Sequence, residues 1–182
     1  MKRIKLTHGI QCTQGEGPLT GVPEISDDLW EAQETFQWNA GQVVFEASAI
    51  ERQARAIFIF YFRPKNWEVL QRAFLQTDFF GFASMVKSLA AIQEAESILE
   101  PKDWKKLEKD LKSTMHRRNM LAHGDFTFGY KGEELVCEVE YFSGTLQKKI
   151  FDDAEWDRTS KRVKDANQGL IRFQIGVHEL PK

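Results

Sequence analysis

Apolar side chains recur at helical spacing through much of the chain, beginning near residue 26. Ser26 followed by Asp27 and Asp28 is typical of a helix start, because acidic residues favour the positive end of a helix. The helical pattern continues to about Arg63, where Pro64 ends it. Asn39–Gly41 offers a point at which this stretch would divide into two helices. Its second half carries an apolar stripe: Val43, Ala47, Ile50, Ala54, Ile57 and Tyr61.

Three further helical segments follow this stretch. Asn66 begins a short one, Asp78 would cap the next, and Pro101 suits the first turn of a third, which runs to about His123. The apolar positions of the first two are Trp67, Leu70 and Phe74, then Phe79, Phe82, Val86, Leu89 and Ile92. Those of the third are Trp104, Leu107, Leu111, Met115 and Ala122.

After Gly124 the pattern changes to short aromatic and β-branched runs separated by turn signals. The runs are Asp125–Tyr130, Glu134–Phe142 and Thr145–Phe151, with Lys131-Gly132 and Ser143-Gly144 between them. They predict an antiparallel meander. A last helix, capped by Asp152 or Asp153, carries a second long apolar stripe: Trp156, Val163, Ala166, Leu170, Phe173 and Val177.

These patterns predict a mainly α protein, a helical bundle with a small β-hairpin or meander before its C-terminal helix. Residues 1–25 contain four Gly and two Pro and read as an irregular arm with one short strand at Ile4–Leu6. We expect residues 26–182 to form a single domain, with the β extension at about 125–151 and the last helix at about 153–177.

Composition narrows the function classes. The net charge of −2 provides no global basic field, so a nucleic-acid site would have to be a local basic patch. Cys12 and Cys137 are far apart, which favours a reduced, cytoplasmic protein over a disulfide scaffold. No apolar run is long enough to span a membrane. No metal-ligand cluster or cofactor motif is visible in the sequence, so we expect neither a metal nor a cofactor.

The strongest candidate for a chemical function is the segment from Arg117 to Gly124, at the end of the helix predicted to begin at Pro101. On a helical wheel, Arg118 falls near the middle of the apolar stripe, whereas Asn119 and His123, four residues apart, share a face at its edge. A histidine can transfer protons near neutral pH, and an arginine can hold the charge of a phosphate. Together they are what metal-free RNA cleavage requires.

Two further features of the sequence bear on this segment, and each has two interpretations. Glu51 lies on an apolar part of its helix, where it would orient Arg118 or else reach water or pair with Arg55. The exposed side of the motif helix is basic, and it would form either an RNA-phosphate track or a solvated face of ion pairs. The residues proposed for the track are Lys105, Lys109, Lys112 and Arg117.

Arg118-Asn119-x-x-x-His123 resembles the R-N-x-x-x-H signature of the HEPN superfamily, over roughly residues 26–124. This resemblance implies a metal-independent endoribonuclease, often a toxin or antiviral effector, with Arg118 and His123 catalytic and Asn119 supporting them. It also implies a homodimer in which two motifs face a composite cleft, with RNA as substrate and an antitoxin protein as a further partner. The alternative is a non-catalytic member that binds a nucleotide or mediates protein assembly.

Overall fold

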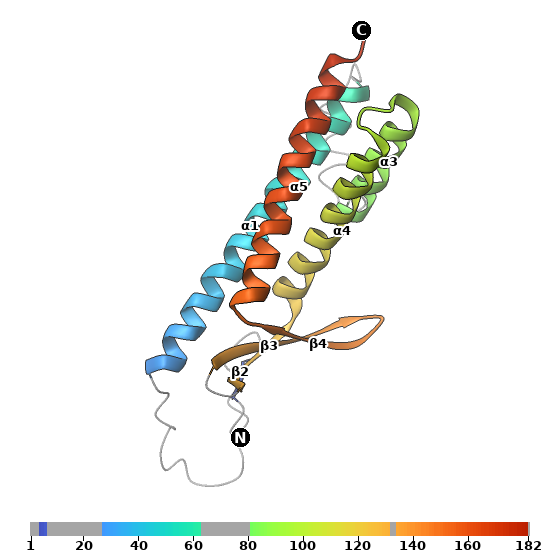
Figure 1. Ribbon diagram of the computed structural model, residues 1–182. Helices are drawn as coiled ribbons and strands as arrows, with labels where there is room; N and C mark the ends of the chain where they lie inside the picture. Colours follow the sequence, from blue (N-terminus) through green and yellow to red (C-terminus); the bar gives the residue numbers. More distant parts are fainter. Residues whose placement is uncertain (1–3, 7–26, 63–80, 132–133, 182) are drawn as a thin grey trace, which may run out of the picture. The chain divides into compact units, whose positions relative to one another are not determined.

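The computed structural model describes residues 4–6, 27–62, 81–131 and 134–181. Figure 1 shows a mainly helical chain with an antiparallel sheet that precedes the C-terminal helix, as the sequence predicts. The helices are α1 (Asp27–Phe62), α3 (Phe82–Glu96), α4 (Pro101–His123) and α5 (Asp153–Glu179). The strands are β1 (Ile4–Leu6), β2 (Asp125–Lys131), β3 (Glu134–Ser143) and β4 (Thr145–Phe151). No described helix combines the length and apolar character needed to cross a membrane.

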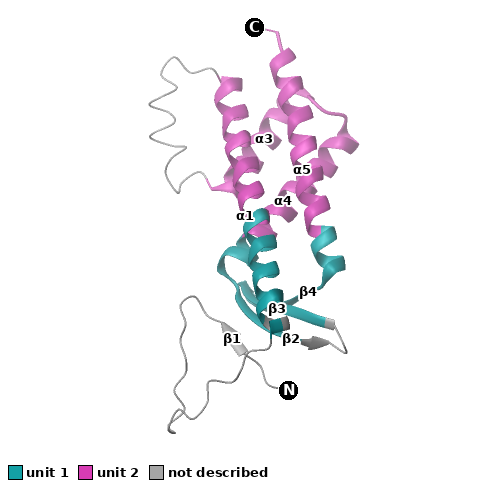
Figure 2. Cartoon of the chain, turned by 90° about the vertical axis from the view of Figure 1, so that its left-hand side faces the viewer, with its two compact units in different colours: residues 1–42, 119–158 teal, residues 43–118, 159–182 magenta. Residues whose placement is uncertain are grey.

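The chain divides into two compact units, each built from two separate segments (Figure 2). The sheet unit comprises residues 1–42 and 119–158, and the helical unit comprises residues 43–118 and 159–182. Helices α1, α4 and α5 each contribute residues to both units. The predicted single domain over residues 26–182 stays a prediction.

In the helical unit, the predicted apolar stripes form the core. Ile50, Ile57, Leu89, Leu111 and Phe173 are each at most 1% exposed. Helices α4 and α5 pack closely, since a Cβ on Gly169 would lie 2.8 Å from Leu107 Cδ1. The Lys106 Nζ of α4 also donates to Asp165 Oδ2 of α5 at 2.8 Å. The core of this unit therefore follows directly from helical periodicity.

In the sheet unit, the strands are antiparallel in the order β1-β2-β3-β4. One face is buried and includes Phe128, Cys137, Val139 and Phe151, which alternate with outward positions as strand geometry requires. Phe36 of α1 packs on this face, with its ring centroid 5.6 Å from that of Phe128 and 5.2 Å from that of Trp156. On the hairpin's other face Phe142 and Leu146 are paired across β3 and β4 and exposed.

Most predicted boundaries agree with the structure, and two local predictions are corrected. Helix α1 continues unbroken through Asn39–Gly41, and Gly81, rather than Asp78, is the N-cap of α3. The Asp152 side chain caps α5, accepting the Glu155 N–H at 2.8 Å. The irregular arm outside Ile4–Leu6 and the helix predicted from Asn66 lie outside the described residues.

Candidate functional site

The three motif residues occupy the last two turns of α4, and the division between the two units falls within them. Arg118 belongs to the helical unit, whereas Asn119 and His123 belong to the sheet unit. Arg118 is half-buried, and Asn119 and His123 are both exposed. Because Asn119 and His123 are four residues apart, their exposed side chains lie on one helical face, in contact with solvent.

In the sheet unit, buried neighbours fix the backbone that carries His123. Met120 and Leu121, in the turn before it, are 2% and 4% exposed. Gly124, the next residue, is buried and donates its N–H to the Met120 carbonyl at 2.9 Å. A Cβ on Gly124 would lie 2.6 Å from that carbonyl oxygen and 2.6 Å from Val139 Cγ1 of β3. His123 therefore ends the helix at a position set by close packing.

The local sequence around Gly124 indicates a helix break and nothing more. The contact that requires a glycine is with Val139, fifteen residues further along the chain, so local pattern alone does not reveal it. The one feature of the sequence that could have indicated this contact is the direct passage from the end of a predicted helix into a predicted strand. A chain that turns with no intervening loop brings the backbones of the two elements close together.

In the helical unit, Arg118 lies on the side of α4 that carries the core positions Leu107, Leu111 and Thr114, all 2% exposed or less. This placement agrees with the helical wheel. The half-buried Glu51 pairs with Arg55, one turn further along α1. That ion pair is one of the two interpretations of Glu51. A role for Glu51 in orienting Arg118 stays a prediction.

The predicted RNA-binding residues differ in whether a carboxylate of the protein already neutralises their charge. Lys105, Lys109 and Lys112 are exposed, and Arg117 is half-buried. Lys112 Nζ lies 2.5 Å from Glu108 Oε1, whereas Lys105 and Lys109 form no ion pair within the part of the chain that the structure describes. Lys105 and Lys109 are thus the members of the proposed track with most charge available for a phosphate.

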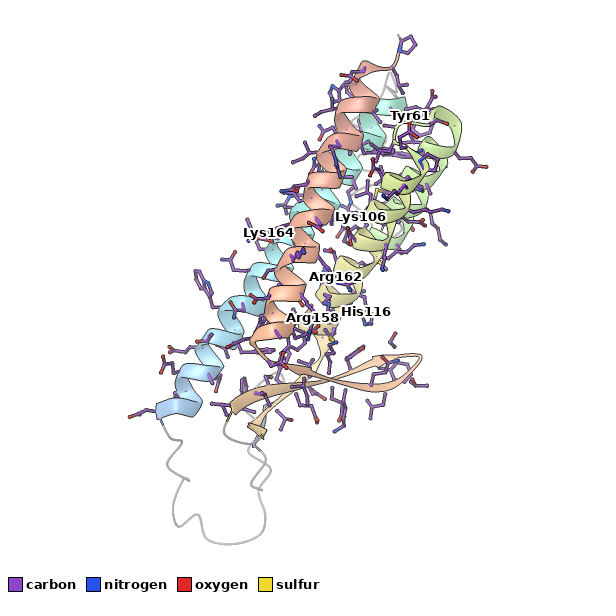
Figure 3. All side chains as sticks on the ribbon, in the orientation of Figure 1. Tyr61, Lys106, His116, Arg158, Arg162 and Lys164 are labelled. Carbon is purple, nitrogen blue, oxygen red and sulfur yellow. The ribbon has the colours of Figure 1, made fainter. Side chains whose placement is uncertain are left out.

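Helix α5 supplies a further cation beside α4, Arg162, which the helical wheel of α4 does not include in the basic face. Figure 3 shows Lys106 on α4 and Arg162 on the neighbouring α5. The Arg162 Nη1 donates to Ser113 Oγ of α4 at 3.1 Å. Lys106 is shared by Asp110 and Asp165, and hydrogen bonds to these two carboxylates raise its pKa. Arg162 could not be assigned from α4 alone, because it comes from a segment distant in sequence.

Neither a metal centre nor a reactive thiol is present in the described part of the chain. No group of three or more His, Cys, Asp or Glu side chains there could hold a metal ion. Cys137 is buried in the sheet, and desolvation raises the pKa of its thiol to about 12. A thiol with this pKa is a poor nucleophile near neutral pH.

Comparison of the chain with protein-family models, with curated proteins and with solved structures finds no match.

Proposed function

We propose that the protein is a metal-independent endoribonuclease of the HEPN type, acting as a toxin or as an antiviral or stress effector. The observation that carries this proposal is the sequence Arg118-Asn119-x-x-x-His123 at the end of an amphipathic helix, with His123 exposed on a rigidly packed helix end. Two exposed lysines without ion pairs in the described chain, Lys105 and Lys109, support an RNA substrate over a neutral one.

The proposed reaction is attack of an RNA 2′-hydroxyl on the adjacent phosphorus. His123 transfers a proton, either from the attacking hydroxyl as a base or to the leaving 5′-oxygen as an acid. Arg118 stabilises the negative charge that builds on the phosphoryl oxygens, and Asn119 holds the imidazole or the phosphate through its amide. The P–O5′ bond breaks, and the products are a cyclic phosphate and a free 5′-hydroxyl.

A homodimer with a composite cleft belongs to the same proposal. Each chain supplies one His123, whereas the reaction needs a base for the nucleophile and an acid for the leaving group. Two motifs that face each other would supply both. A toxin of this type would also need a partner, such as an antitoxin protein, that masks the cleft.

RNA cleavage in the presence of a metal chelator tests the proposal. We expect the wild type to cleave single-stranded RNA and His123→Ala to lose roughly 100- to 10,000-fold in rate, the usual contribution of a general acid or base. His178→Ala is the matched control, because His178 is also an exposed histidine near a helix end but lies on α5 and stacks on Phe60. Equal background cleavage by the wild type and His123→Ala would refute ribonuclease activity and favour the non-catalytic alternative.

A further inference from the structure

The sheet unit contains a cavity of about 310 Å³, formed by the start of α1, the buried face of the sheet and the start of α5. Aromatic side chains from all three parts contribute to its lining: Phe36, Phe128, Phe151 and Trp156. Its volume is at the lower end of the range of small-molecule sites, so it suits a ligand of modest size.

The charged groups in the lining are all of one sign. Glu31, Asp152 and Asp153 line the cavity, and no Lys, Arg or His among the described residues does so. The Asp152 carboxylate already accepts the Glu155 N–H, and its Oδ1 lies 3.9 Å from the Arg158 guanidinium. Asp152 is thus committed to capping α5.

Glu31 and Asp153 remain available to a ligand. Both are exposed, and neither forms a hydrogen bond or an ion pair in the described part of the chain. Asparagine and threonine side chains, Asn39 and Thr35, add neutral polar groups to the same lining. The buried thiol of Cys137 also lines the cavity and is uncharged at neutral pH, so the negative charge comes from the carboxylates alone.

The aromatic residues form a connected cluster at this cavity. The ring centroid of Phe36 lies 6.0 Å from that of Phe151, and the centroids of Phe151 and Trp156 are 4.6 Å apart. Aromatic rings attract cations through their quadrupole, most strongly for tryptophan and where water is excluded. Rings together with carboxylates, and without a basic residue, are complementary to a positively charged organic group rather than to a phosphate.

We propose that this cavity binds a small organic ammonium ion, with Trp156 and its neighbouring rings around the alkylated nitrogen and with Glu31 and Asp153 supplying the opposite charge. The cavity lies wholly within the sheet unit, and this proposal does not depend on ribonuclease activity.

Calorimetric titration with choline tests the proposal, with 3,3-dimethylbutan-1-ol as a neutral probe of the same shape. We expect the wild type to bind choline about ten-fold more tightly than the neutral probe, with about five-fold from the two carboxylates and about two-fold from the cation–aromatic contact. No choline binding up to millimolar concentrations, or equal binding of the two probes, would overturn the proposal, since equal binding indicates an apolar pocket without charge selectivity.

Paired variants locate the binding site. Glu31→Gln with Asp153→Asn should weaken choline binding about five-fold, since two exposed carboxylates contribute modestly. Glu34→Gln with Asp157→Asn removes two exposed carboxylates of the same unit that do not line the cavity and should leave binding unchanged. Trp156→Leu should also weaken binding, whereas Trp156→Phe should retain most of it. Wild-type affinity in both the Glu31/Asp153 variant and Trp156→Leu would show that choline binds elsewhere and refute this site.

Discussion

Gly124 connects the chemistry proposed for His123 to the packing of the sheet. Its hydrogen atom occupies a space that Met120 and Val139 leave too small for a methyl group. The position of the motif at the end of a helix could be predicted from the sequence, because helical spacing is a local property. The Gly124 contact could not, since it depends on a side chain fifteen residues away. For Glu51, the observed pairing with Arg55 was one of the outcomes that the sequence left open.

Replacement of Gly124 by alanine should therefore destabilise the fold. The added Cβ would lie 2.6 Å from both a backbone oxygen and a core methyl group, and such overpacking typically costs about 1–3 kcal/mol. Gly41→Ala is the matched control, because Gly41 is exposed within α1 and a Cβ added there would meet nothing within 4 Å, so alanine should stabilise by about 0.5–1 kcal/mol. Urea denaturation followed by circular dichroism measures both changes, and a Gly124→Ala variant as stable as the wild type would contradict the packing argument.

The boundaries of helices and strands could be predicted where a single hydrophobic pattern, helical periodicity or strand alternation, determines them. The stripe on α5 and the alternation in β2, β3 and β4 gave boundaries within a residue or two of those observed. Asn39–Gly41 failed as a break because its own Ala40 and the flanking Phe36 and Val43 are buried. The packing of these three side chains holds α1 together and outweighs the weak helix propensity of Asn and Gly. Tertiary packing therefore decided what local propensity left open.

The exposed face of α4 yields a prediction about RNA affinity. In a His123→Ala background, which prevents cleavage, Lys105→Gln with Lys109→Gln should weaken RNA binding. The negative slope of log K against log salt should become less steep by about 1.4, or about 0.7 for each lost phosphate contact with a single strand. Fluorescence anisotropy with a labelled RNA at several salt concentrations measures this slope. Arg52→Gln with Lys87→Gln removes two exposed charges of the same unit from α1 and α3, and it should leave the slope unchanged. An identical loss in both double variants would indicate a general charge effect rather than a track on α4.

At the scale of the whole molecule, the relevant properties are the net charge of the chain and its division into two units. The chain carries 25 basic and 27 acidic residues, so affinity for RNA must come from a local arrangement such as the cations of α4 and α5. The division into two units could not be predicted, because α4 and α5 each continue as one helix through the positions where the units change. A periodic stripe reports which side of a helix is buried, and it does not report which other segments bury it.

The composite cleft proposed above predicts that an inactive chain will suppress an active one. If a functional cleft needs His123 from two chains, wild-type protein mixed with a ten-fold excess of His123→Ala should retain about a tenth of its activity per wild-type chain, the share of wild-type chains that random exchange pairs with each other. The measurement is the cleavage rate at saturating RNA after the mixture has equilibrated, with light scattering to establish the dimer. His178→Ala in the same excess controls for added protein, because it should itself cleave RNA. Unchanged activity per wild-type chain beside excess His123→Ala would show that one chain carries a complete site, and a single His123 would then have to serve as both base and acid.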